Sequence, residues 1–197
     1  GLAAGFPMLV NTVFPGVDAF QFAFIGPLLA AFVRPIGGWL ADRLGGAIIT
    51  FTIFLIMAVA PLAATAFLPG AHGGGNVIGF VAMFLVLFLA AGIGNGSTFR
   101  MIPIIFRTLR ERRVTDRNDE TALEQARRDG ATEAAAAMGL SAAVAAFGGF
   151  FIPIAYGASI ELTGGPQGAL VFFSVFYLSC VLVTWRWYSR KEAEVSC

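Results

Sequence analysis

A single arginine interrupts a long apolar stretch of the sequence. Arg34 is followed by Pro35 and by Gly37 and Gly38 in the run GPLLAAFVRPIGGWLADRLGG, residues 26–46. An arginine at the centre of a membrane helix costs about 3 kcal/mol on insertion scales, so it normally faces a cavity or a partner. Its guanidinium is a planar fork of donors that suits a planar anion with several oxygens. We therefore expect Arg34 to form the centre of an anion-binding site.

The alternative for Arg34 is a structural ion pair with a buried carboxylate. Asp18 and Asp42 lie at the ends of their apolar stretches, and Glu161 lies near the outer end of its own. The sequence thus has no acid in the middle of such a stretch. An anionic ligand explains Arg34 better than a pair within the chain, and an acid from a longer protein is the remaining alternative.

Two glycine-rich stretches are further candidates. Residues 91–103 read AGIGNGSTFRMIP, and residues 139–153 read GLSAAVAAFGGFFIP. Small residues let helices approach closely, and helix packing is the simpler explanation for most of these glycines. The functional alternative is a narrow path for a small ion, lined by backbone amides and small polar groups, with Asn95 and Ser97 as candidates.

The charged residues at the ends of these stretches suggest a gate. Arg100 lies near the end of its stretch, where its long side chain can reach the interface, so we expect a role at the mouth of the path. Asp42 can pair with Arg43 or with a neighbouring helix, and Gly45 and Gly46 make the reversal that follows. Such an ion pair can stabilise one conformation of a protein and break in another.

The composition indicates an integral membrane protein. Of 197 residues, 57% are hydrophobic and only 13% are charged, against roughly 25% charged in soluble domains. The sequence contains no nucleophile–base pair and no cluster of metal ligands, and His72 is the only histidine. We therefore expect neither an enzyme nor a metal, cofactor or nucleic-acid site.

Stretches of about 20 apolar residues predict spanning helices. The expected spans are residues 1–14, 19–40, 47–68, 77–106, 134–162 and 168–188, the first cut short because the chain opens inside an apolar run. The long hydrophilic segment 107–133 is predicted to be a loop, with a short helix capped by Asn118 over residues 119–128. We read it as a solvated connector rather than a lipid or regulatory contact. The expected fold class is all-α, a polytopic bundle of transmembrane helices.

The lysines and arginines predict the orientation. The turns 15–18, 69–76 and 163–167 contain none, whereas Arg43, the segment 107–133 and the stretch 186–191 are basic. Positive charge stays on the cytoplasmic side. We therefore expect the segment 107–133 and the C-terminus to be cytoplasmic in a multi-pass protein of the cell inner membrane.

Three motifs together resemble a known family. GGWLADRLGG (37–46) is similar to the conserved loop motif of the major facilitator superfamily, in its copy between spans eight and nine. With GIGNGSTFRMIP (92–103) and GLSAAVAAFGGFF (139–151), the chain resembles the nitrate/nitrite porter (NarK-type) family. The resemblance covers nearly the whole chain. It implies the C-terminal six-helix half of such a transporter, from a partial span seven to span twelve.

The resemblance also implies a site and its partners. The family binds its anion between two six-helix halves, with one arginine from each, and Arg34 matches the second-half arginine. Residues 139–150 match the second glycine-rich nitrate signature, which makes Gly139, Gly148 and Gly149 substrate-binding candidates. The implied partners are nitrate and nitrite as substrates, membrane lipid, and the N-terminal six-helix half. The implied function is transport by alternating access.

The charges favour nitrate/nitrite exchange over proton symport. Proton-coupled carriers place a titratable group inside the membrane, and this chain has none near mid-depth. Nitrate stays ionised at physiological pH, and arginine does not titrate there. Proton-coupled nitrate symport, transport of another small anion, and a membrane module that only packs helices are the alternatives.

Overall fold

The computed structural model describes residues 2–21, 23–70, 74–116 and 119–189, and all the regular elements in these ranges are helical. They are α1 (Leu2–Val13), the 3-10 turn η1 (Ala19–Gln21), α2 (Ile25–Leu44), α3 (Gly46–Thr65), α4 (Val77–Glu111), α5 (Glu120–Thr163), α6 (Gln167–Thr184) and the π-helical turn η2 (Trp185–Ser189). The all-α fold class that the sequence predicts is confirmed.

Four helices in the described ranges are long and apolar enough to cross a membrane. They are α3, α4, α5, and α6 together with most of η2. The apolar helix α1 is shorter. Helix α2 is not among the four, because its 20 residues include Arg34, Asp42 and Arg43.

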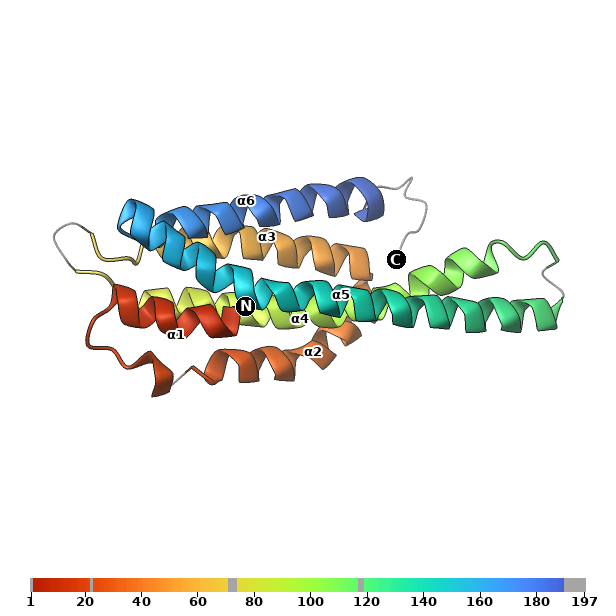
Figure 1. Cartoon of the computed structure of the whole chain (residues 1–197). Coiled ribbons are helices and arrows are strands. Elements are labelled where there is room, and N and C mark those ends of the chain that lie inside the picture. Colours follow the sequence, from red (N-terminus) through yellow and green to blue (C-terminus); the bar gives the residue numbers. More distant parts are fainter. Residues whose placement is uncertain (1, 22, 71–73, 117–118, 190–197) are drawn as a thin grey trace.

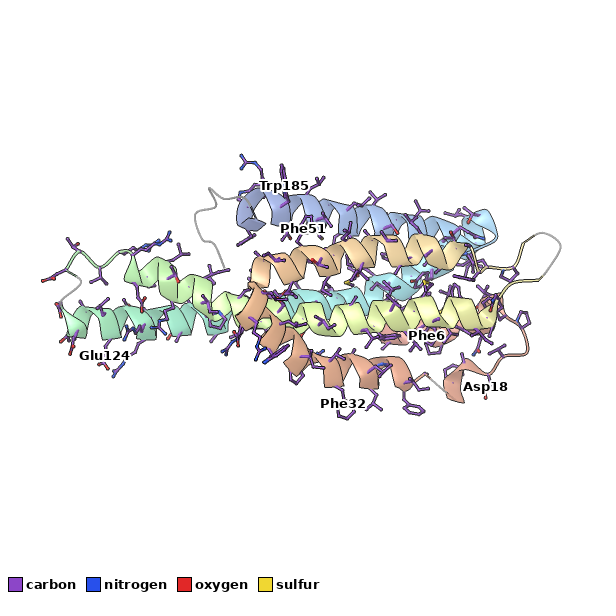
Figure 2. The ribbon with its side chains drawn as sticks, turned by 180° about the vertical axis from the view of Figure 1, so that it is seen from behind. Phe6, Asp18, Phe32, Phe51, Glu124 and Trp185 are labelled. Carbon is purple, nitrogen blue, oxygen red and sulfur yellow. The ribbon has the colours of Figure 1, made fainter. Side chains whose placement is uncertain are left out.

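The helices run side by side along one long axis, with α4 at the centre (Figure 1). Helix α4 packs on α2, α3 and α5, while α6 packs mainly on α3 and α1 mainly on α5. Phenylalanines from α1 and α4 fill the core: the Phe6 and Phe84 ring centroids are 5.2 Å apart, and those of Phe80 and Phe84 are 4.9 Å apart. Phe6 points into the bundle, whereas Phe32 on α2 and Trp185 point outward (Figure 2).

Helix α2 begins at Ile25, six residues after the start of the predicted span. Gly16 has a φ of +98°, and Asn11 Oδ1 accepts a hydrogen bond from the Ala19 amide at 3.0 Å. This turn at Gly16 and the bond to Ala19 precede residues 19–21, which form the separate turn η1. Helix α2 then continues to Leu44, and Gly45, with a φ of +89°, makes the reversal into α3.

The hydrophilic segment 107–133 is more helical than the predicted loop with one short helix over residues 119–128. Helix α4 continues to Glu111, and α5 begins at Glu120 with the Asp119 side chain accepting from the Ala122 amide at 3.0 Å. The predicted cap Asn118 lies outside the described residues. The 35 and 44 residues of the two helices correspond to about 52 and 66 Å, against about 30 Å for a hydrocarbon core. Their ends, residues 107–116 and 119–133, form a helical hairpin that extends beyond the bundle (Figure 1).

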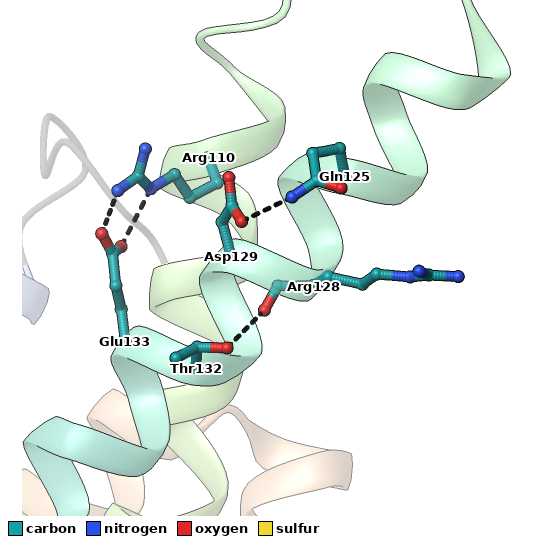
Figure 3. A network of polar contacts seen from close by, with 6 residues as sticks. All are labelled: Arg110, Gln125, Arg128, Asp129, Thr132 and Glu133. Atoms are coloured by element: carbon teal, nitrogen blue, oxygen red, sulfur yellow. Dashed lines mark hydrogen bonds and ion pairs between the residues drawn. The ribbon is translucent and has the colours of Figure 1, made fainter.

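Ion pairs hold this helical hairpin together. Arg110 makes a two-bond ion pair with Glu133 (Figure 3). Glu111 Oε1 accepts from Arg127 Nε at 2.7 Å and from Arg107 Nε at 2.9 Å. These residues lie outside the apolar parts of α4 and α5, and the arginine hydrogen bonds lower the pKa of both Glu111 and Glu133. The charges of this segment therefore pair largely with one another.

Candidate anion-binding site

Arg34 lies halfway along α2, on a face that is open in this chain. Its side chain makes no hydrogen bond or ion pair to any residue in the ranges that the structure describes. A guanidinium without a carboxylate keeps its five donors available for a ligand. The structural ion pair considered from the sequence therefore does not form within the described part of the chain.

Arg34 lines a cleft of about 900 Å³ between the helices. The other polar side chains of its lining come from α3, α4, α5 and α6: Thr50, Asn95, Thr98, Ser141 and Tyr177. Gly94 and Gly148 add small residues, and the remaining lining residues are apolar. The lining thus combines one positive charge with neutral hydroxyl and amide groups. This combination suits a small monovalent anion better than a cation or a dianion.

The apolar part of α5 forms an open wall beside this cleft. Leu140, Val144, Phe147, Phe150 and Phe151 are each between 61% and 69% exposed. Large apolar side chains in a row mark a surface that contacts lipid or another part of a protein. The lining residues Arg34, Asn95 and Ser141 are also exposed, so the cleft is open on one side in this chain.

The predicted glycines of α5 differ in their positions. Gly148 lines the cleft. Gly139 is exposed, and a side chain added there would enter open space. Gly149 is half-buried beside Gly148 but does not belong to the lining. The structure therefore brings only Gly148 of these three together with Arg34.

Asn95 and Ser97 face different ways although they are two residues apart. Asn95 lines the cleft and is exposed. Ser97 is fully buried and donates to the Gly46 carbonyl at 3.2 Å, with its oxygen 3.3 Å from Thr50 Oγ1. Ser97 thus ties α4 to the start of α3 and lies outside the cleft lining.

The charged residues at the end of α2 form one pair between helices. Arg100 Nε donates to Asp42 Oδ1 at 2.8 Å, which joins α4 to α2. Arg43 instead stacks over the Trp39 ring, with its guanidinium carbon 4.1 Å from the ring centroid. Of the two pairings that the sequence left open for Asp42, the one with a neighbouring helix is present.

Four polar residues of the lining were not among the predicted site residues: Thr50, Thr98, Ser141 and Tyr177. Thr50 lies in the apolar stretch 47–68, where a single threonine gives no signal of its own. Thr98 lies three residues after Asn95, so helical spacing could have put it on the same face. Ser141 lies inside the glycine-rich stretch 139–153 but was not singled out. Tyr177 comes from α6, and nothing in the local sequence distinguishes it from the other aromatics there. Among the described residues, no group of three histidines, cysteines or acids could hold a metal ion.

The chain is similar to curated transport proteins over nearly its whole length. No family model matches the chain. It is 45% identical over 192 residues to the nitrate/nitrite transporter NarU of Escherichia coli K12. This alignment covers 98% of the chain and 41% of the relative. It is also 45% identical over 194 residues to NarU of Salmonella typhimurium, with the same coverage. It is 31% identical over 201 residues to the probable nitrate/nitrite antiporter NarK2 of Thermus thermophilus, in an alignment that covers the whole chain and 40% of the relative.

The all-α fold, the four apolar helices and these similarities define a multi-pass membrane chain that is homologous to part of a transporter of the major facilitator type. The chain is a homologue of part of the nitrate/nitrite transporters NarU and NarK2. It spans about two fifths of the length of these relatives. The family resemblance of the three motifs is thus confirmed, and the relatives that match are transporters rather than enzymes.

Proposed function

We propose that this chain is the C-terminal six-helix half of a carrier that moves nitrate and nitrite across the cell inner membrane by alternating access. Arg34 binds the anion from this half, and a second half supplies the opposite wall of the cleft. The observation that carries the proposal is Arg34 without an ionic partner in the described ranges, facing a cleft whose other polar side chains are neutral. The names of the relatives agree with this substrate class.

The open wall of α5 supports the need for a second half. Exposed phenylalanines and aliphatic residues of α5 adjoin, in sequence, the residues that line the cleft. An anion bound in this open cleft would remain in contact with lipid or water. Covering this face encloses the anion, which strengthens its attraction to Arg34 because the local dielectric falls. In this arrangement the helical hairpin and the C-terminus lie in the cytoplasm, in agreement with the positive-inside rule applied to the arginines.

Exchange of nitrate for nitrite follows from the charges around the cleft. The lining contains no carboxylate or histidine among the described residues, so it offers no group to carry a proton. A second arginine across the empty cleft would repel Arg34, which makes the empty carrier reluctant to close around the site. A bound anion removes this repulsion and lets the two halves rock. The carrier then changes conformation mainly when loaded, which is obligatory exchange.

Counterflow in liposomes containing the full-length carrier tests the proposal. Labelled nitrate should enter when nitrite or nitrate is present inside, and little should enter when the vesicles contain no such anion. An inward proton gradient alone should drive little uptake. Robust uptake into anion-free vesicles under that gradient would establish proton symport instead, and failure of nitrate and nitrite to compete would indicate another small anion.

A further inference from the structure

Helices α2 and α4 meet backbone to backbone at Arg34. A Cβ atom added to Gly96 would collide with the carbonyl oxygen of Arg34 itself. One turn earlier, a Cβ on Gly92 would collide with the carbonyl oxygen of Ala30, and on the α2 side a Cβ on Gly37 would collide with that of Ile93. Glycine is therefore the residue that allows α4 to touch the main chain of α2 on both sides of Arg34.

The same turn of α4 is fixed to the reversal between α2 and α3. Ser97 donates to the Gly46 carbonyl at 3.2 Å, and the side chain of Met101 packs against Gly46. Arg100 pairs with Asp42 at 2.8 Å. Residues 96–101 of α4 therefore form a fixed surface on which the second half of α2 rests, and Gly96 is the part of that surface that touches Arg34.

A proline next to Arg34 explains why the contact between α2 and α4 matters for this arginine. Pro35 has no amide hydrogen, so the helix loses the bond that would reach the carbonyl of Ala31. The main chain beside Arg34 therefore has less support from its own helix than an ordinary turn has. A guanidinium that grips a planar anion through two parallel bonds must be aligned closely with it.

We propose that Gly96 is a positioning residue for Arg34. It does not touch the anion. It lets α4 support the Arg34 peptide, and so it fixes where the guanidinium enters the cleft. This inference rests on the proposed function, because it assigns to Gly96 a part in binding the same anion.

The test is Gly96→Ala in the full-length carrier, with nitrate exchange measured over a range of concentrations. The new methyl group must displace the Arg34 peptide, so we expect the nitrate KM to rise by about tenfold or more. The maximal rate and the amount of folded carrier should change much less. Thermal unfolding of the purified carrier reports stability separately from binding.

The matched control is Gly26→Ala. A Cβ there would collide with the Phe88 ring, so it disturbs the same pair of helices eight residues before Arg34, about 12 Å away along the helix. We expect this variant to lose thermal stability and to keep the wild-type KM. Gly157→Ala, where a Cβ enters open space, should resemble the unaltered carrier in both measurements.

The outcomes separate the two proposals. A wild-type KM in Gly96→Ala, or an equal rise in Gly26→Ala, would show that Gly96 only packs helices. If Gly96→Ala does not fold, Gly92→Ala replaces it as the test variant. The nitrate KM of Gly92→Ala should rise by a smaller factor, because the new methyl group displaces Ala30, one turn from Arg34. An unchanged KM in Gly92→Ala would overturn the inference. An unaltered carrier without saturable nitrate or nitrite exchange would overturn the proposed function as well.

Discussion

Arg100 on α4 and Asp42 on α2 are joined by a hydrogen-bonded ion pair of 2.8 Å, two helical turns from Arg34. Their side chains are 59% and 43% exposed. An exposed pair of this kind contributes about 0–1 kcal/mol to stability, so the fold does not depend on it. A contribution of that size does matter for a carrier that alternates between two conformations of similar free energy.

We therefore expect Asp42→Asn and Arg100→Gln to change the rate of nitrate exchange in the same direction, because each removes the same pair. Thermal stability should change by less than about 1 kcal/mol. Exchanging the two residues, with Asp42→Arg and Arg100→Asp together, should restore much of the rate. The control is Arg43→Gln, since Arg43 stacks on Trp39 rather than pairing with Asp42. Single variants that move the rate in opposite directions would contradict a shared role.

Arg34→Lys should reduce nitrate binding strongly while the carrier still inserts and folds. Lysine keeps the positive charge but lacks the planar fork, and a hydrogen bond to a charged group contributes about 1.5–3 kcal/mol. We expect the nitrate KM to rise by about ten- to a hundredfold. Arg186→Lys is the matched control, because Arg186 lies beside Trp187 in η2, just after α6, and not in the cleft lining. Near-normal exchange by Arg34→Lys would remove Arg34 from the site.

The charged residue of the cleft lining was visible in the sequence because membrane chemistry is restrictive. An arginine in an apolar stretch is costly, so Arg34 stood out without any knowledge of the helix packing. The side of a helix on which a small polar residue lies is less visible. Asn95 and Ser97 are two residues apart and therefore point about 200° apart on a helix, so only one of them could line the cleft.

The structure of the hydrophilic segment 107–133 could be predicted from the sequence only in part. A high density of charged residues normally indicates a segment exposed to solvent, and for residues 107–133 this density favoured the prediction of a loop. The i, i+4 spacing of Arg107 and Glu111 was a local helix signal. The pair between Arg110 and Glu133 was not readable, because it joins residues 23 positions apart. It depends on the close approach of the two helices at Gly130, where a Cβ would lie 3.1 Å from the Cα of Arg107.

Cysteines introduced at Gly70 and Thr121 should react with impermeant reagents from opposite sides of the membrane. Both positions are exposed, and a side chain at Gly70 enters open space. The orientation inferred from the arginines puts Gly70 outside and Thr121 in the cytoplasm. The measurement uses intact cells and inverted vesicles, in a carrier whose other cysteines are replaced by serine. Labelling of both positions from one side would contradict the proposed path of the chain.

The helical hairpin should lose stability in acid. Its two helices are joined by Arg110 and Glu133, and the hydrogen bonds from Arg110 lower the pKa of Glu133 below its usual value of 4.5. A carboxylate with a lowered pKa stabilises the folded state above its unfolded pKa, and that stabilisation is lost as the pH falls through the lower folded value. The protection of the hairpin amides against hydrogen exchange, corrected for the intrinsic rate, should therefore be steady from neutral pH to about 5 and fall below about 4.

Glu133→Gln removes the titrating group of this pair, so protection at neutral pH should already be lower, and the further fall in acid should be smaller. Glu124→Gln is the matched control. Glu124 lies on the same helix, its contact with Arg128 is 3.9 Å long, and its side chain is 70% exposed, so its removal should leave protection nearly unchanged. If Glu133→Gln and Glu124→Gln lower the protection equally, the hairpin is held by general electrostatics of the segment rather than by the pair between Arg110 and Glu133.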